Sequence, residues 1–217
     1  NVGFPAIDLI KAGLLAKPAE LEARFGLHAD RPLVVFTQHS VTTEFMDAAE
    51  QVRPALRVMQ RLAREGVQVV LTYPNNDAGG RRIIAELEKV RREKIPGVQV
   101  LASMGRYNYH GALALSRAVC VGNSSSGIKE TPAVGAPFVN IGSRQDGRLR
   151  STNVLDTGYD EKSIEKACRK ALFDLKFRAK CRICKNPYGV GDSGRKIARV
   201  LATVPLDRRL LQKKMTY

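Results

Sequence analysis

The stretch Ala118-Val-Cys-Val-Gly-Asn-Ser-Ser-Ser-Gly-Ile-Lys-Glu-Thr-Pro132 decides the fold, because an apolar run ends there at a small polar loop that opens a helix. Residues 118–121 are typical of a buried strand. Residues 123–126, which include Ser124 and Ser125, supply hydroxyl donors and N-cap residues at the expected start of the helix, where unpaired N–H groups and the positive dipole end favour an anion. The stretch therefore predicts a phosphate-type anion site. The alternative is an ordinary capped turn between a strand and a helix.

Three other residues of this stretch refine the prediction. Gly122 and Gly127 lack side chains, so we expect them to let the backbone approach a ligand closely. Glu130 comes about one and a half turns into the helix, too far from its start to serve a phosphate. Its carboxylate is suited instead to accept hydrogen bonds from a sugar diol bound alongside.

The composition bounds the class of protein. The chain has 217 residues, enough for one large domain or at most two small ones, and one domain is the simpler interpretation. Its formal net charge of +15 favours anionic partners. The basic residues lie in separate runs at 144–150, 176–185 and 208–214, without an aromatic-rich binding sheet. Nucleic acid is therefore not the expected partner. These runs are interpreted as solvated faces or as surfaces that meet an acidic partner domain.

Targeting and metal signals are weak in this sequence. No apolar run is long enough to span a bilayer and no signal-peptide pattern opens the chain, which predicts a cytoplasmic protein without a membrane partner. Cys120 lies in the expected buried strand, so no disulfide framework is expected. Cys181-Arg-Ile-Cys184 has metal-motif spacing but lacks two further nearby ligands, so neither a metal site nor a cofactor is expected.

The order of elements predicts the fold class. Five short apolar strands and a shorter sixth are expected at 33–37, 67–72, 98–101, 118–121, 138–141 and 154–156. Amphipathic helices are expected between and after them, at 47–65, 81–93, 107–116, from 125 onward, 164–173 and 194–204. Two short helices at 5–15 and 19–25 precede the first strand, and a last helix is expected at 206–214. This alternation predicts an α/β fold, a doubly wound parallel sheet of Rossmann-like type.

The polar loops share one edge of this predicted sheet. In the common strand order 3-2-1-4-5-6 the first and fourth strands are neighbours, so the loops carrying His39 and Ser124 open onto one crevice. Every unusual loop follows the carboxyl end of a strand: 38–44, 75–80, 104–107, 122–130 and 142–148. We therefore expect the functional site on this rim.

In these loops, the sequence resembles the carboxy-terminal half of the hydrolysing UDP-N-acetylglucosamine 2-epimerases of sialic and related nonulosonic acid synthesis. The matching motifs, in family order, are Gln38-His-Ser-Val-Thr-Thr43, Pro74-Asn-Asn-Asp-Ala-Gly79, Gly122-Asn-Ser-Ser-Ser-Gly-Ile-Lys-Glu130, Asn140-Ile-Gly-Ser-Arg-Gln145 with Gly147-Arg148, and Asn153-Val154. The resemblance covers essentially the whole chain.

The resemblance implies a domain organisation and a set of site residues. The chain would be the second domain of a two-domain GT-B-type enzyme, with lead-in helices at 1–30, a UDP-binding Rossmann-like domain at 31–205 and a tail helix at 206–217. By position, Ser124 and Ser125 would hold the phosphates, Glu130 the ribose, the backbone near Gly105 and Arg106 the uracil, Asn75 and Arg144 the rest of the nucleotide, and His39 the diphosphate and sugar. The alternatives are an Asn-rich turn at Asn75 and an exposed cation at Arg144.

The resemblance also implies chemistry and partners. UDP would leave as the C2 proton of the sugar is removed, and water would then add to the glycal with inversion at C2, releasing an N-acetylmannosamine-type sugar. Carboxylates of an absent amino-terminal domain would move the protons, which leaves His39 as the catalytic candidate of this chain. It would steady the leaving diphosphate or help to transfer a proton. The expected partners are UDP, a UDP-amino sugar, the missing domain and further copies of the chain in a homo-oligomer.

Two other functions remain open from the sequence. The donor-nucleotide domain of a GT-B glycosyltransferase would share the serine loop and the role of Glu130, but would pass the sugar to an acceptor. The loops at 75–79 and 144–148 favour the epimerase. A basic nucleic-acid module, in contrast, predicts salt-sensitive binding to any duplex.

Overall fold

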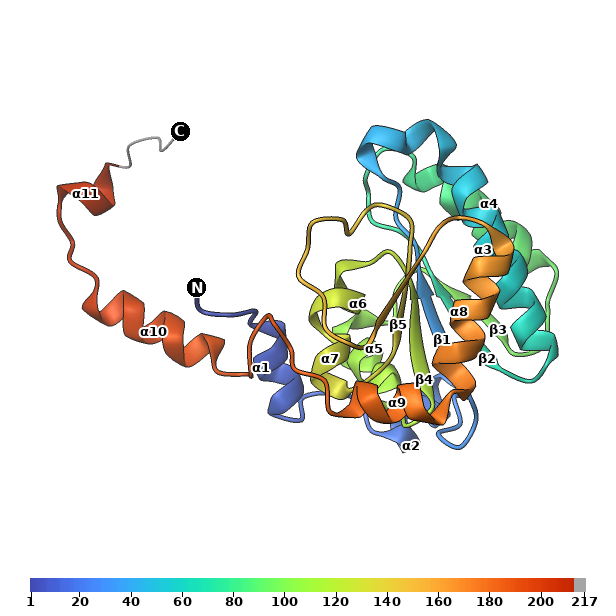
Figure 1. Ribbon diagram of the computed structural model, residues 1–217, viewed down its shortest axis with the longest axis horizontal. Coiled ribbons are helices and arrows are strands. Elements are labelled where there is room, and N and C mark those ends of the chain that lie inside the picture. Colours follow the sequence, from blue (N-terminus) through green and yellow to red (C-terminus); the bar gives the residue numbers. More distant parts are fainter. Residues whose placement is uncertain (213–217) are drawn as a thin grey trace.

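The structure is a computed structural model and describes residues 1–212. Its centre is a six-stranded sheet in the order β3-β2-β1-β4-β5-β6, with every neighbouring pair parallel (Figure 1). The strands are β1 (Leu33–Thr37), β2 (Gln68–Thr72), β3 (Val98–Leu101), β4 (Ala118–Gly122), β5 (Phe138–Ile141) and β6 (Val154–Thr157). The predicted Rossmann-like class and strand order are confirmed.

The central strands are buried on both faces because helices cover the sheet on each side. Every residue of β1, β2, β4 and β5 is buried, which explains why these strands read as apolar runs rather than as alternating patterns. The register sets Thr37, the last residue of β1, beside Gly122, the last residue of β4. The loops that follow these two strands therefore start side by side.

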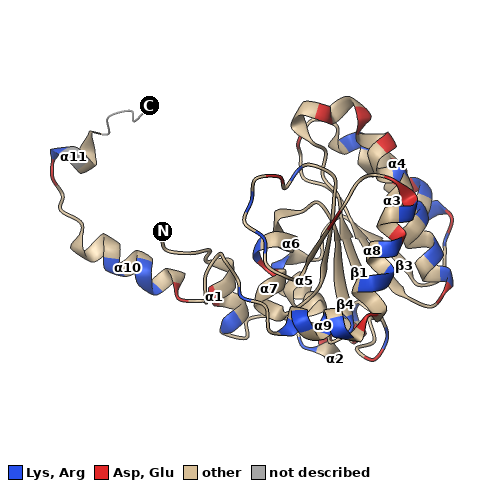
Figure 2. Cartoon of the chain, viewed as in Figure 1, with Lys and Arg blue, Asp and Glu red and all other residues tan. Residues whose placement is uncertain are grey.

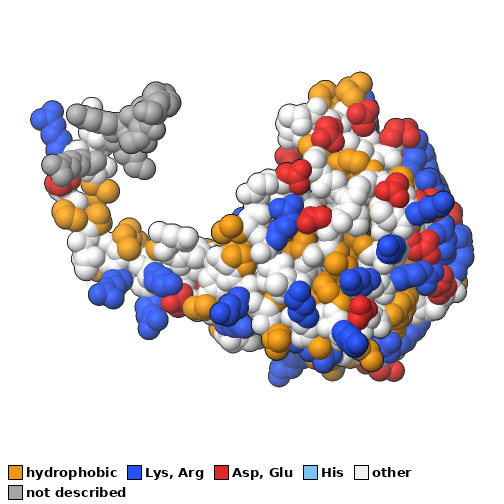
Figure 3. Space-filling model, in the orientation of Figure 1, with side chains coloured by type: hydrophobic (Ala, Val, Ile, Leu, Met, Phe, Trp, Pro, Cys, Tyr) orange, Lys and Arg blue, Asp and Glu red, His pale blue; other side chains and the backbone are white. Residues whose placement is uncertain are grey.

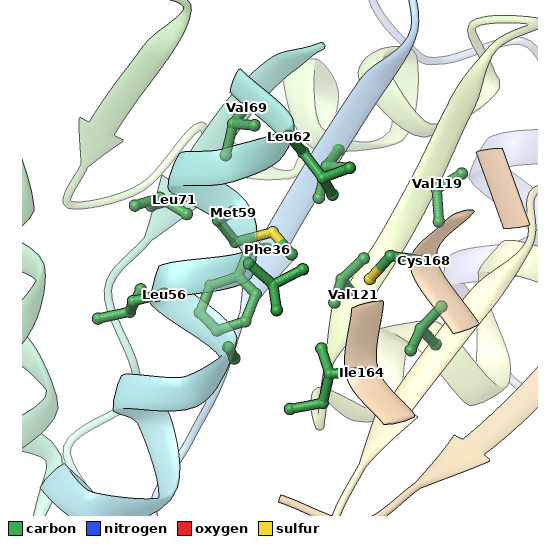
Figure 4. Close-up of a cluster of buried hydrophobic side chains, with 14 of the residues drawn as sticks. Phe36, Leu56, Met59, Leu62, Val69, Leu71, Val119, Val121, Ile164 and Cys168 are labelled. Carbon is green, nitrogen blue, oxygen red and sulfur yellow. The ribbon is translucent and has the colours of Figure 1, made fainter. Parts of the chain in front are cut away.

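On one face, α3 (Ala48–Arg64), α4 (Gly80–Arg92) and α8 (Glu161–Phe173) pack against the sheet. Figure 4 shows part of this core, where Phe36 of β1 lies against Met59 of α3. Helix α9 (Leu175–Arg182) was not expected from its basic sequence. It forms because Phe177 and Cys181, four residues apart, lie on one side of a helix and bury in the same core.

On the other face lie α2 (Pro18–Phe25), α5 (Gly105–Ala114), α6 (Ser125–Lys129) and α7 (Thr131–Val134). Helix α2 ends where Gly26 takes a left-handed conformation. Helix α1 (Ala6–Lys11) packs against α7 and α10 (Ser193–Thr203). The division of the chain at residues 30 and 205 stays a prediction.

Two glycines of the deciding stretch serve protein packing rather than ligand approach, which corrects the sequence interpretation. A Cβ at Gly122 would lie 2.0 Å from the carbonyl oxygen of Thr37. A Cβ at Gly127 would lie 2.3 Å from the ring of Phe138. The loop after β4 is thus held tightly against the neighbouring strands, and its glycines are needed for that contact.

The segments beyond the sheet differ in their packing. Helix α10 extends away from the body and α11 (Arg208–Leu211) lies farther out along the same arm (Figure 1). The last helix was expected at 206–214, and its residues 213–214 lie outside the described part of the chain. A short 3-10 helix, η1 (Thr42–Asp47), follows the loop after β1. Within residues 1–212, no helix combines the length and apolarity needed to cross a membrane.

The positive charge is largely interleaved with negative charge on the face formed by α3, α4 and α8 (Figures 2 and 3). Arg57 lies 2.6 Å from Glu161, and Arg169 lies 2.6 Å from Glu65. Exposed pairs of this kind add little stability, but they reduce the local positive potential. This face fits a solvated surface better than a track for nucleic acid.

Candidate functional site

A cleft opens at the carboxyl edge of the sheet, where the loops after β1, β3 and β4 meet. Its volume is about 320 Å³. Five of the predicted site residues line it: His39, Gly105, Arg106, Ser124 and Glu130. Three others, Asn75, Ser125 and Arg144, do not line this cavity. Asn75 and Arg144 lie on the loops after β2 and β5, and Ser125 is the first residue of α6. The structure therefore brings together residues that are up to 91 positions apart, from His39 to Glu130.

Asn123 joins three loops of this edge and was not singled out as a site residue in the sequence. Its side chain accepts a hydrogen bond from the backbone N–H of His39 (2.7 Å) and donates to the carbonyl of the same residue (2.8 Å). Its own carbonyl accepts from the side chains of Gln145 (2.7 Å) and Arg144 (3.3 Å). Asn123 is completely buried, so it fixes the loops after β1, β4 and β5 relative to one another.

His39 is held in a defined tautomer. Its Nδ1 accepts a hydrogen bond from the backbone N–H of Asn75 (2.9 Å), so the proton of the neutral ring sits on Nε2, and the ring lines the cleft. Burial, together with the positive charge of Arg144, lowers the pKa of His39 from 6.5 to about 4, although Asp77 opposes the shift. At neutral pH the ring is therefore an uncharged donor.

The low pKa of His39 favours one of the two roles expected for this residue, steadying the leaving diphosphate, over the other, proton transfer. A proton donor in catalysis works best when its pKa is near the working pH, and an imidazole with a pKa of about 4 is not charged there. The geometry and the low pKa fit a hydrogen-bond donor to an oxyanion better than they fit an acid that gives up a proton.

Asn75, Asp77 and Arg144 form a polar cluster at the rim beside His39. The side-chain amide of Asn75 donates to the carboxylate of Asp77 (2.6 Å). The guanidinium of Arg144 lies 3.6 Å from the same carboxylate. Because this ion pair is long and partly exposed, Arg144 can exchange Asp77 for a stronger anion at small cost. Asp77 is a residue that the sequence analysis did not assign.

The serine loop presents two hydroxyls to the cleft, from Ser124 and Ser126. Ser124 caps α6, since its Oγ accepts from the backbone N–H of Ser126 (3.4 Å). The hydroxyl of Ser126 also bonds that of Tyr109 at 2.6 Å. The predicted helix start at Ser125 is confirmed, but α6 has only five residues and α7 follows directly. A helix this short has a weaker dipole than the sequence interpretation assumed.

Glu130 lies at the junction of α6 and α7 and lines the cleft, as its predicted role requires. Its Oε2 is 2.7 Å from Nε2 of His110. His110 comes from α5 and is only 2 % exposed. The sequence analysis missed this partner. The available signal was its position five residues after Gly105, on the helix whose start was already assigned to the site.

Glu44 joins two further loops at this edge of the sheet by hydrogen bonds. Glu44 in η1 accepts hydrogen bonds from the hydroxyl of Ser143 (2.9 Å) and from the side chain of Gln51 (2.7 Å). Because Ser143 precedes Arg144, Glu44 ties the segment after His39 to the loop that carries this arginine. Spacing in the sequence contained no signal for it.

The described residues hold no cluster of three or more metal-ligating side chains. All four cysteines are free thiols. Burial raises the pKa of Cys120 to about 12 and that of Cys181 to about 11, so neither forms a thiolate at neutral pH. The polar side chains that line the cleft carry hydroxyl, carboxylate, imidazole and guanidinium groups.

Fold and cleft together define a class: a Rossmann-like α/β domain with a cleft at the switch point between β1 and β4. Comparison with known proteins then identifies the family. The chain belongs to the UDP-N-acetylglucosamine 2-epimerase family, whose model matches residues 1–202.

The relatives differ in their sugar. The chain is 31% identical over 219 residues to the UDP-N,N'-diacetylbacillosamine 2-epimerase (hydrolyzing) of Legionella pneumophila, covering 100% of this chain and 55% of that protein. It is also 31% identical over 179 residues to a UDP-N-acetylglucosamine 2-epimerase of Neisseria meningitidis, covering 82% of this chain and 45% of the relative. The chain thus spans about half the length of the curated relatives it matches.

Solved structures agree on the fold. The UDP-GlcNAc 2-epimerase from Neisseria meningitidis bound to UDP-GlcNAc superposes with a TM-score of 0.72 at 16% identity, over 93% of this chain and 54% of that one. A UDP-forming trehalose-phosphate synthase from Burkholderia xenovorans gives a TM-score of 0.58 at 17% identity, over 93% of this chain and 51% of that one. This architecture is therefore common to epimerases and glycosyltransferases.

Proposed function

We propose that this chain is the carboxy-terminal, UDP-binding half of a hydrolysing UDP-N-acetylglucosamine 2-epimerase. One observation carries the proposal: a single cleft collects His39, the serine loop and Glu130 at the switch point of the sheet, in a chain of the 2-epimerase family. The Neisseria structure bound to UDP-GlcNAc shares the fold, which supports a nucleotide sugar as the ligand.

The side chains at the cleft suit different parts of a uridine nucleotide. The hydroxyls of Ser124 and Ser126 and the Nε2–H of His39 are donors suited to the diphosphate, with Arg144 nearby. Glu130 is an acceptor, so it suits the ribose diol and would repel phosphate. Gly105 and Arg106 also line the cleft, and their backbone is assigned to the uracil.

The chemistry needs more groups than this half supplies. Elimination of UDP and hydration at C2 require an acid and a base that reach the sugar. In the cleft, Glu130 is engaged by His110, and His39 is uncharged at neutral pH. The proposal therefore assigns the proton transfers to the missing amino-terminal domain. The groups of this chain bind UDP and stabilise the charge that develops on it as it leaves.

The experiment is a titration of the 217-residue chain with UDP by calorimetry, followed by NMR of UDP-GlcNAc incubated with the same protein. We expect saturable UDP binding and no turnover. Absence of UDP binding at millimolar concentration would refute the nucleotide site. Steady release of free amino sugar would show that the catalytic groups lie within this chain, which would contradict their assignment to a second domain.

A glycosyltransferase donor domain is the second candidate, because the trehalose-phosphate synthase shares this architecture. The full-length protein distinguishes the two functions. Release of a free N-acetylhexosamine from UDP-GlcNAc without an acceptor supports hydrolysis, whereas a strict requirement for an acceptor supports transfer. The sialic or nonulosonic acid route, the cytoplasmic location and the homo-oligomeric state stay predictions.

A further inference from the structure

The contact between His110 and Glu130 is the one buried histidine–carboxylate pair among the described residues. His110 Nε2 lies 2.7 Å from Glu130 Oε2, and the two side chains are 2 % and 15 % exposed. A carboxylate at the end of a glutamate side chain has several rotamers, so a fixed buried neighbour restricts its orientation. The imidazole thus determines where the second oxygen of Glu130 lies.

The hydrogen-bonding pattern of the ring indicates which atom donates. Nδ1 of His110 is buried and has no hydrogen-bond partner among the described residues. In the tautomer with its proton on Nε2, the ring donates to Glu130, and only an acceptor lone pair is left unpartnered at Nδ1. The opposite tautomer would bury an unpaired N–H and set two acceptors against each other. The first arrangement is therefore favoured.

Tyr109 and His110, which are adjacent in α5, each bond to a residue of the segment that follows β4. Tyr109 bonds the hydroxyl of Ser126 at 2.6 Å, and His110 bonds the carboxylate of Glu130 at 2.7 Å. The same helix begins at Gly105, which lines the cleft. Because α5 carries both Gly105, which is expected near the uracil, and His110, which contacts Glu130, this one helix sets the distance between the expected uracil position and the expected ribose acceptor.

We propose that His110 is a positioning residue: it occupies one oxygen of Glu130 and aims the other at the ribose diol of a bound uridine nucleotide. This proposal rests on the proposed UDP-binding function. It predicts that His110 contributes to affinity for ligands that contain ribose and contributes little to affinity for a bare diphosphate. A purely structural histidine would affect both kinds of ligand equally.

The test compares UDP with inorganic pyrophosphate by calorimetry on the folded 217-residue chain. For Glu130→Gln we expect UDP to bind about ten- to hundredfold more weakly. For His110→Leu we expect a loss of about three- to tenfold for UDP and less than about twofold for pyrophosphate. His110→Gln, whose side-chain amide can still donate to Glu130, should recover UDP affinity to within about twofold.

Two controls separate positioning from stability. Leu113 is a buried core residue of the same helix, so Leu113→Ala should lower the melting temperature and leave the ratio of the two affinities unchanged. The double variant His110→Leu with Glu130→Gln should bind UDP no more weakly than Glu130→Gln alone, because both changes remove one coupled function. If His110→Leu does not fold, His110→Asn replaces it, since its shorter amide does not reach Glu130.

The outcomes distinguish this inference from the function on which it rests. Normal UDP affinity in His110→Leu, while Glu130→Gln is weakened, overturns the positioning role and leaves the UDP site intact. Equal losses for UDP and pyrophosphate in His110→Leu also overturn it, in favour of a structural role. Failure of the unaltered chain to bind UDP overturns the proposed function itself.

Discussion

Replacing His39 should remove an acid-sensitive component of folding stability. In the folded chain, burial first and the positive charge of Arg144 second lower the pKa of His39 to about 4. The unfolded chain has a histidine pKa of about 6.5. Between these two values the unfolded state binds a proton that the folded state excludes. Stability is therefore fully present above pH 6.5 and is lost as the pH falls toward 4.

The size of this component follows from the two pKa values. Integrating the linkage relation between pH 7 and pH 5 gives a loss of about 2 kcal/mol attributable to His39 alone. Lowered carboxylate pKa values, such as those of Glu86 and Glu65 next to arginines, also reduce stability as the pH falls. Only the difference between wild type and a His39 variant isolates the histidine.

The assay is urea unfolding of the wild type and of His39→Asn at several pH values from 7 to 5. Asparagine retains an acceptor for the N–H of Asn75 and does not titrate. We expect the wild type to lose about 2 kcal/mol more than the variant over this range. Ser125→Ala is the matched control, because it alters the same rim without removing a titrating group, and its curve should run parallel to that of the wild type.

Parallel curves for wild type and His39→Asn would refute the reasoning. They would mean that water reaches the ring in the folded protein, so that burial does not oppose its charge. An NMR titration of the histidine ring protons in the folded chain gives the same information directly, with a midpoint expected near pH 4.

The remaining predictions concern packing. Gly127→Ala places a methyl group 2.3 Å from the ring of Phe138 and should lower the free energy of unfolding by about 1–3 kcal/mol. Its control is Gly158→Ala, whose methyl group would meet only one atom, at 3.6 Å. This control should change the free energy of unfolding by less than about 0.5 kcal/mol. Arg178→Met removes donors to the carbonyls of Ala171 and Ser116 and should cost about 1–3 kcal/mol, whereas the exposed Arg182→Met should be nearly neutral. Denaturant melts check both pairs, and equal effects within a pair would contradict the packing argument.

The sequence alone determined the layers of this protein and the edge at which its site lies. The strands at 33–37, 98–101 and 138–141 were predicted with the bounds that the structure shows, because short buried apolar runs between amphipathic helices have few other solutions. Parallel strands all end at the same edge, so the loops that follow them had to meet.

Tertiary structure decided the contacts within that edge. Asn123 reaches His39 across 84 positions and His110 reaches Glu130 across 20, and neither pairing is encoded in local spacing. The same holds for Gly122 and Gly127, whose neighbours come from other strands, and for the lowered pKa of His39, which depends on burial and on Arg144. Local patterns specify which elements form, whereas a hydrogen bond or a pKa depends on the side chains that packing brings within a few ångströms.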